Sequence, residues 1–373
     1  MTENKAATNG AAKTSASTNS HEERATVILQ IIERYGLNYE RTGSWDGFAT
    51  FLPVVKGQIE RGESIKMLLP GFPFKSPNNK TKVLGVLPDL GEELALKRLD
   101  SIASAIDAVY EHGTEIHITS DGLVYNGTPY NTGSVSLELT TNVSVDLLDV
   151  TDETVWDFGQ AVREMADSHG LKHLSFLRLW DLLGNTGDFK SKDYYLAHAD
   201  SIRQELKQRF SDPQFEADMA NKSTADMHMT HTKYLKFVEQ DLRYNEKHLA
   251  LSEEDKKANM ANTAKEMMGR WKAFSAALAS VPTEYIRLSI HDSGGSDKLS
   301  MALIPQREKG SLGATPWHST LIVESDGTFT QMQRHKVSQE KYELVERYGR
   351  PYFWREKGAP REVQTAMGLL KLS

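Results

Sequence analysis

A proline-rich loop carries the first residues whose side chains could do chemistry. The stretch Gly71 to Lys82 reads GFPFKSPNNKTK, with lysines and a serine next to prolines. Because proline fixes φ, such a loop can hold ammonium and backbone N–H groups in place at little entropic cost. Lys75, Ser76, Lys80 and Lys82 therefore suit a phosphate or carboxylate ligand. The residues alone leave open a surface loop with solvated lysines.

A second group lies on the alternating segment from Tyr285 to His291. Every second residue is apolar, whereas the other face offers a guanidinium, a hydroxyl and an imidazole. If that face lines a cleft, Arg287 could bind an anion and His291 could transfer protons. The alternative is a sheet with one solvated face.

Two further candidates lie at expected strand ends. His318 begins the apolar segment HSTLIVE, and Asp121 follows the segment EIHIT in a Ser-Asp-Gly turn. Strand ends often carry the functional groups of α/β enzymes. A structural histidine and a plain Asp-Gly turn are the alternatives.

A strand-helix-strand pattern is expected to position these groups. The segment KVLGVL (82–87) predicts a strand, apolar residues from Leu96 to Val109 share one helix face, and EIHIT (115–119) predicts a second strand. This order indicates a βαβ unit with a parallel pair. Helical spacing then dominates up to Leu278, and strands return at 284–291 and 318–324. The turn Ser325-Asp326-Gly327, which ends the last of these strands, is typical of a hairpin. We expect an α/β fold with a Rossmann-like mixed sheet flanked by helices and a mostly helical insertion in the middle of the chain.

Composition limits the function classes. The chain has 373 residues, 39% hydrophobic and 25% charged, which is typical of a globular protein. We expect a disordered tail over 1–21, a first helix from near Glu22 and a single domain over 22–373. With a net charge of −7 and no signal peptide or membrane span, we expect a cytoplasmic protein that binds neither nucleic acid nor membrane.

The sequence lacks the motifs of common cofactor sites. There is no cysteine, and no G-x-G-x-x-G, P-loop or G-x-S-x-G pattern. The pairs His169/His173 and His228/His231 could each share a helix face, but neither has a clear third metal ligand. We therefore expect no metal and no cofactor.

Six blocks together resemble one family. They are GFPFKSPN (71–78), KVLGVLPDLGEELAL (82–96), TSDGLVYN (119–126), DLLDVTDETVWDFG (146–159), YIRLSIHDS (285–293) and TPWHST (315–320). The chain is similar to the isonitrile (isocyanide) synthases related to pyoverdine and paerucumarin biosynthesis proteins and to the fungal dityrosine spore-wall enzyme. The blocks keep their order over most of the chain after the tail.

This resemblance implies an enzyme of secondary metabolism that joins the α-amine of an L-amino acid to the C2 carbonyl of ribulose 5-phosphate, without a metal or redox cofactor. The C2 carbon becomes the isonitrile carbon after carbon-carbon cleavage and phosphate loss. Within the blocks, we expect Lys75, Ser76 and Lys82, with Lys298, to bind the phosphate. We expect Arg287 to bind the carboxylate, and His291, His318 and Asp121 to transfer protons. A downstream oxygenase or peptide synthetase would be a separate protein.

Two points stay open from sequence. The segment Gly127 to Val145 departs from the family pattern, and is either a lineage-specific loop or a translated intron. The product could be an N-formyl amino acid, as in a dityrosine-type enzyme, or the chain could be a non-catalytic protein that binds a sugar phosphate.

Overall fold

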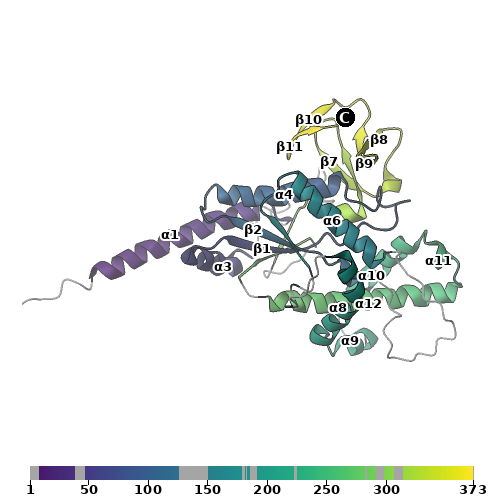
Figure 1. Ribbon diagram of the computed structural model, residues 1–373, viewed down its shortest axis with the longest axis horizontal. Helices are drawn as coiled ribbons and strands as arrows, with labels where there is room; N and C mark the ends of the chain where they lie inside the picture. The colour runs from purple at the N-terminus through teal and green to yellow at the C-terminus, as the bar shows by residue number, and fades with distance from the viewer. Residues whose placement is uncertain are drawn as a thin grey trace, which may run out of the picture.

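The computed structural model describes residues 8–37, 47–125, 150–178, 181, 183–184, 191–221, 225–281, 284–290, 298–305 and 314–372. A sheet with helices on both faces carries a smaller β-rich lobe formed by the C-terminal part of the chain (Figure 1). The atypical segment 127–145 and His291 lie outside the described residues.

The central sheet is parallel throughout its described pairs. Its strands are β1 (Ile65–Pro70), β2 (Thr114–Thr119), β3 (Leu174–Leu177), β4 (Ile286–Ser289) and β5 (Leu299–Ser300), in the order β3-β2-β1-β4-β5. Because such a sheet is covered on both faces, its inner strands read as apolar runs such as IKMLLP in β1. The expected α/β class is confirmed.

The expected strand over 82–87 is wrong. That segment is irregular, and β2 pairs instead with β3 and with β1, which precedes the proline-rich loop. The backbone carbonyl of Lys82 accepts a hydrogen bond from the N–H of Arg334, at 3.0 Å. Leu84 packs with Ile322 and Trp354 of the C-terminal lobe. Contacts with distant segments thus determine this conformation. A local sequence pattern carries no information about such contacts.

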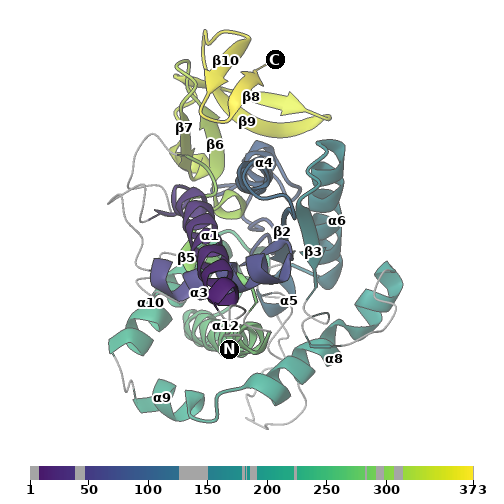
Figure 2. The same cartoon turned by 90° about the vertical axis from the view of Figure 1, so that its left-hand side faces the viewer.

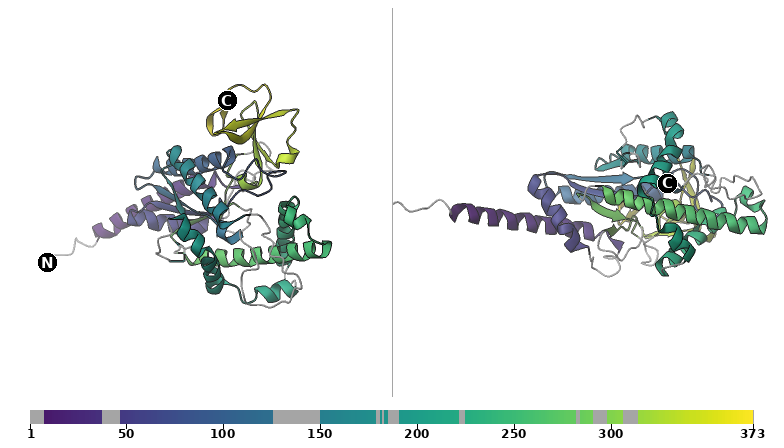
Figure 3. Two further views of the ribbon diagram at one scale, coloured as in Figure 1. Left: turned by 45° about the vertical axis from the view of Figure 1, so that its right-hand side comes forward. Right: turned by 90° about the horizontal axis from the view of Figure 1, so that it is seen from below.

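Helices cover both faces of the sheet. α4 (Leu90–Asp107) and α6 (Asp152–Ser168) lie on one side, and α12 (Glu253–Ser280) lies on the other (Figure 2). Figure 3, in its view from below, shows α12 running across the sheet. α3 (Phe48–Arg61) contacts β1 and β4. α4 begins with a capping box, in which Asp89 accepts from the N–H of Gly91 and Glu92 accepts from the N–H of Asp89, both at 2.9 Å.

The helical insertion between β3 and β4 is confirmed. Its described helices are α8 (Lys192–Phe210), α9 (Phe215–Asn221), α10 (Ala225–Leu242), α11 (Glu246–Leu249) and α12. None of the described helices combines the length and apolar character needed to cross a bilayer.

The first helix starts earlier than expected. α1 spans Thr8–Glu33, although the sequence predicted a tail up to residue 21 and a helix from near Glu22. The added turns lie in the alanine-containing segment TNGAAKTSAS, and alanine has the highest helix propensity.

The C-terminal lobe contains a four-stranded mixed sheet in the order β7-β6-β9-β8, with the hairpin β10-β11 beside it. Its elements are η2 (Pro316–His318), β6 (Thr320–Val323), β7 (Phe329–Met332), η3 (Arg334–Lys336), β8 (Tyr342–Arg347), β9 (Arg350–Glu356), β10 (Glu362–Thr365) and β11 (Gly368–Lys371). The predicted hairpin turn is confirmed between β6 and β7, where Gly327 has a φ of 81°. Leu90 and Leu94 of α4 pack against Phe329 and Phe353, so this lobe sits on the first turns of α4.

Close approach at Gly122 joins three parts of the main domain. A Cβ there would lie 2.5 Å from Cγ1 of Val155 and 2.6 Å from the carbonyl oxygen of Pro73. We expect Gly122→Ala to lower the free energy of unfolding by about 1–3 kcal/mol, because backbone cannot move aside cheaply. Gly85→Ala is the control, since its Cβ would meet nothing within 4 Å. Urea unfolding that shows equal stability for both variants would contradict this packing.

Candidate active site

The candidate site lies at the carboxyl ends of the parallel strands, where ligands of open α/β sheets bind. The loop after β1 runs beside the turn after β2, because the N–H of Gly71 donates to the carbonyl of Thr119 at 3.0 Å. The N–H of Ser76 donates to the carbonyl of Trp317 at 2.9 Å, which ties the same loop to the C-terminal lobe. Sequence segments far apart therefore meet at this edge.

Lys75 is buried in an ion-pair cluster. Its side chain is 0% exposed, and Nζ lies 2.6 Å from Oδ2 of Asp89 and 2.9 Å from Oε2 of Glu92. Nζ also lies 3.3 Å from the carbonyl oxygen of Pro316. Burial disfavours the lysine charge, but the two carboxylates outweigh it and raise the pKa of Lys75. Burial raises the pKa of Glu92 to about 7, against the attraction of Lys75. One cation already has two carboxyl partners here, so the cluster offers no surplus positive charge.

Ser76 and Lys82 share a second buried carboxylate, that of Asp241 on α10. Ser76 Oγ donates to Oδ1 of Asp241 at 2.7 Å, and Lys82 Nζ donates to the same oxygen. Lys82 Nζ also lies 4.8 Å from the ring centroid of Phe237. Burial raises the pKa of Asp241 above its usual value, although Lys82 opposes this. These residues hold the loop after β1 against α10.

Asp121 is a buried acid with spare hydrogen-bonding capacity. Its Oδ1 has no hydrogen-bond partner among the described residues. Burial raises the pKa of Asp121 from 3.8 to about 7. Tyr234 of α10 and Tyr125 of α5 (Gly122–Tyr125) hydrogen-bond to each other and lie close enough for the Asp121 charge to raise both of their pKa values. A carboxyl group that titrates near neutral pH suits general acid–base catalysis.

The remaining predicted residues are more dispersed. The imidazole of His318, in η2 and not in a strand, packs edge-on against Phe237 with ring centroids 4.9 Å apart. Arg287 is half-buried and its Nη1 donates to the carbonyl of Leu278 at the end of α12, at 3.0 Å. The solvated face considered for its strand is wrong, because Ser289 on that face is buried and Arg287 contacts the end of α12. Lys298 directly precedes β5.

One face of α10 connects four of the predicted residues. Tyr234 lies near Asp121, Phe237 contacts Lys82 and His318, and Asp241 binds Ser76 and Lys82. The sequence alone does not indicate this face, because Tyr234 and Phe237 have the helical spacing of a buried apolar stripe. The spacing i, i+3, i+7 of two aromatic residues and an aspartate was the available signal.

Two arginines near the ends of β2 and β3 were also missed. Arg163 and Arg178 line a pocket with Ser120 and Trp156. Arg163 follows the buried stripe of α6, so a sequence pattern reads it as a solvated residue. Only the folded chain brings it to Arg178.

The histidine pairs do not form metal sites in the part of the chain that the structure describes, where no group of three or more histidine and acidic residues could hold a metal ion. His169 caps the end of α6. His173 lies between two carboxylates of α4, with ring nitrogens 2.7 Å from Asp100 and 3.0 Å from Asp107. These contacts join β3 to α4.

A family model described as "Pyoverdine/dityrosine biosynthesis protein" matches residues 55–128 and 130–345. The chain belongs to this family. Across 342 residues it is 44% identical to the isocyanide synthase xanB of Aspergillus fumigatus. The alignment covers 90% of this chain and 42% of xanB. It is 28% identical over 304 residues to the L-tyrosine isonitrile synthase of Xenorhabdus nematophila, and this alignment covers 80% of each chain.

The family fold is also shared. The crystal structure of PvcA from Pseudomonas aeruginosa matches with a TM-score of 0.68 and 25% identity, over 89% of this chain and 99% of PvcA. The resemblance read from the six blocks is thus confirmed at the level of family and fold. The chain spans less than half the length of xanB.

We expect Lys75→Met to lower the free energy of unfolding by about 3–5 kcal/mol, because it leaves two buried carboxyl groups without their cation. Lys80→Met is the control, since Lys80 is an exposed residue of the same loop. Chemical denaturation of both variants measures the difference. Equal stability of the two variants would mean that the cluster does not hold the loop.

The pKa of Asp121 predicts a change in pH dependence. The folded chain keeps this proton up to about pH 7, whereas the unfolded chain loses it near 3.8. The stability contributed by this group is therefore lost as pH rises between these values. We expect Asp121→Asn to be more stable relative to wild type at pH 8 than at pH 5, by a few kcal/mol at most. Denaturant unfolding at both pH values tests this. The exposed variant Glu340→Gln should follow wild type.

Proposed function

We propose that this protein is an isonitrile synthase, which converts the α-amino group of an L-amino acid into an isonitrile with ribulose 5-phosphate as the carbon donor. The observation that carries the proposal is the similarity, over 90% and 80% of the chain, to two relatives named for isocyanide and isonitrile synthesis. The sugar-phosphate donor and the amino acid are our inference from the family resemblance.

The first step suits the buried acid at the sheet edge. Attack of the amine on the C2 carbonyl gives a carbinolamine, which loses water to form the imine. The nitrogen must lose a proton and the departing hydroxyl must gain one. Asp121, with a pKa near 7, can hold or release a proton at neutral pH. We propose Asp121 as the proton carrier of this step, with His318 and His291 as carriers for the later proton shifts.

Binding roles complete the proposal. Arg287 would bind the amino-acid carboxylate, and Lys75, Ser76, Lys82 and Lys298 would contribute to the phosphate site. The ion pairs of Lys75 and Lys82 favour a role in which they position the loop after β1. We further propose that an oxygenase or a peptide synthetase acts on the product in the cytoplasm.

The family description supports one alternative product. Because it names dityrosine biosynthesis, the released product could be an N-formyl amino acid. A non-catalytic protein that binds a sugar phosphate would release no phosphate at all.

The test is a panel of L-amino acids with ribulose 5-phosphate. We expect phosphate release with at least one amino acid, and a product that a tetrazine traps as an isonitrile. An N-formyl product by mass spectrometry would support the alternative. No phosphate release with any amino acid would overturn the synthase proposal.

Substitutions separate the proposed roles. We expect Asp121→Asn to lower kcat by about 100-fold or more, because general acid–base catalysis contributes roughly that much. Arg287→Ala should raise KM for the amino acid and leave KM for ribulose 5-phosphate unchanged. Steady-state kinetics with each substrate varied in turn measures both effects. Wild-type kinetics in Asp121→Asn would remove Asp121 from the mechanism.

A further inference from the structure

Asp121 differs from the other buried carboxyl groups at this edge of the sheet. Two of those groups bind the ammonium group of Lys75, and Asp241 binds that of Lys82. Asp121 is buried too, but no basic side chain among the described residues lowers its pKa. Its Oδ1 accepts no hydrogen bond from those residues either. Because a buried carboxylate without a cation is costly, a cationic ligand would stabilise it.

Thr119 provides a second buried oxygen atom at the same strand end. It is the last residue of β2 and is 0% exposed, and its Oγ1 has no hydrogen-bond partner in the part of the chain that the structure describes. Its neighbours on the adjacent strands are Pro70 and Leu177, whose side chains carry no polar group. A valine would fill this position without leaving a buried polar atom unpaired, so packing of the strand does not explain the hydroxyl.

The side chain of Thr119 lies on the face of the sheet that α12 covers. Leu68 of β1 pairs with both His117 and Arg287, and Arg287 donates to the carbonyl of Leu278 in α12. Alternate residues of a strand point to the same face, so Thr119 shares the face of His117 and Arg287. The hydroxyl and the guanidinium proposed for the substrate carboxylate are therefore on one side of the sheet.

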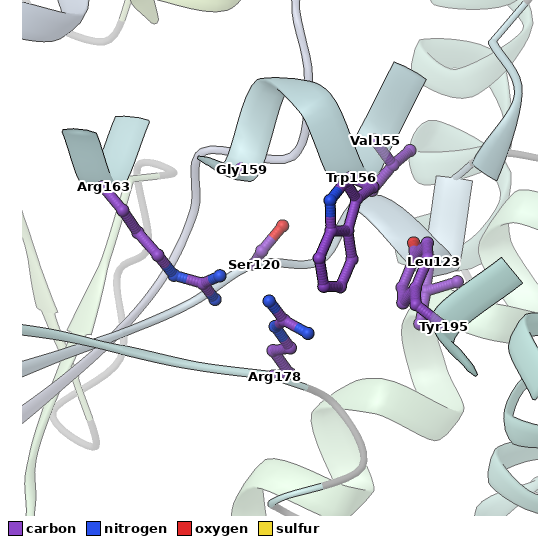
Figure 4. Close-up of a pocket in the computed structure, with 8 residues that line it drawn as sticks. All are labelled: Ser120, Leu123, Val155, Trp156, Gly159, Arg163, Arg178 and Tyr195. Carbon is purple, nitrogen blue, oxygen red and sulfur yellow. The ribbon is translucent and has the colours of Figure 1, made fainter. Parts of the chain in front are cut away.

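The next hydroxyl along the chain, that of Ser120, points elsewhere. Figure 4 shows it in a pocket with Trp156 and Arg163 of α6. Since α6 and α12 lie on opposite sides of the sheet, this is the alternation expected at the end of a strand. The pocket in Figure 4 therefore does not explain the unpartnered hydroxyl of Thr119.

Two tyrosines place Asp121 near the α12 side as well. Tyr125 and Tyr234 hydrogen-bond to each other; burial raises the pKa of both, and the nearby charge of Asp121 raises it further. The ring of Tyr125 stacks on that of Trp271 in α12, with ring centroids 6.5 Å apart. A carboxylate and a hydroxyl beside aromatic rings are groups that bind ammonium ions.

We propose that the α-ammonium group of the amino-acid substrate binds here, with Oδ1 of Asp121 and Oγ1 of Thr119 as its hydrogen-bond acceptors. An ammonium group has several N–H donors, and it is the group that the other buried carboxylates of this edge bind in Lys75 and Lys82. Transfer of one ammonium proton to the Asp121 carboxylate leaves a neutral amine, whose lone pair can attack a carbonyl carbon, and a neutral carboxylic acid. Thr119 then holds the amine in place through its hydroxyl.

The inference rests on the proposed function for the identity of the ligand as an amino acid. Binding of the ammonium group is measured without the reaction, so the two proposals can fail separately.

The test is calorimetric titration of wild type and Thr119→Val with each of the common L-amino acids. The tightest binder is then compared with its analogue that lacks the amino group. We expect Thr119→Val to bind the amino acid about 10-fold more weakly, as for the loss of one hydrogen bond to a charged group. Both proteins should bind the analogue equally, because it has no ammonium group to contact the hydroxyl.

Thr114→Val is the matched control. Thr114 begins the same strand, is also buried, and has an Oγ1 without a hydrogen-bond partner among the residues described. Both valine variants should keep or raise the wild-type melting temperature, because neither breaks a hydrogen bond of the folded chain. Thr114→Val should bind the amino acid as wild type does, since it lies at the opposite end of β2 from Asp121.

Three results would overturn the inference. They are no binding of any amino acid by wild type, unchanged affinity in Thr119→Val, or an equal loss of affinity for the analogue that lacks the amino group. If wild type binds the amino acid through Thr119 but releases no phosphate from ribulose 5-phosphate, the synthase proposal fails and the ammonium site stands. Phosphate release by Thr119→Val with the wild-type KM for the amino acid would reject the ammonium site and leave the synthase proposal intact.

Discussion

The buried contact of Lys75 with Asp89 and Glu92 is the constraint on which the sheet edge depends. It joins the loop after β1 to the first turn of α4, and the carbonyl of Pro316 brings in the C-terminal lobe. The same carboxylates accept the capping hydrogen bonds of α4. One lysine therefore links a strand end, a helix start and a second lobe. Since a buried ion pair is costly unless every partner is present, the three parts stabilise one another.

The polar groups at this edge divide into two electrostatic types. The clusters around Lys75 and Lys82 are closed, because buried carboxylates face each cation. Asp121 is of the other type, a buried acid with a raised pKa whose Oδ1 has no hydrogen-bond partner among the described residues. Clusters with paired charges hold loops in position, whereas a buried polar group with unused hydrogen-bonding capacity can still interact with a ligand.

Helix α10 could be predicted from the sequence, but its contacts with the site could not. Its aromatic residues have helical spacing, so the helix itself was predictable. The face that meets the sheet edge is decided by Asp241, which contacts Ser76 and Lys82, residues more than 150 positions away. The strand expected over 82–87 is absent for a related reason, because the backbone carbonyl of Lys82 accepts a hydrogen bond from the distant N–H of Arg334. Local periodicity carries no information about such contacts.

The sequence by itself determined the α/β class, the helical insertion, the hairpin turn at Gly327 and, through the resemblance of six sequence blocks, the family. These follow from apolar periodicity, turn chemistry and residue order, which are local properties. It also marked Lys75, Ser76, Lys82 and Asp121 as chemically important. Only the tertiary structure decided what each contacts: two lysines paired with buried carboxylates, an aspartate raised in pKa by burial, and two arginines brought together from separate elements. Charge balance and burial depend on distance in space, and the fold alone sets those distances.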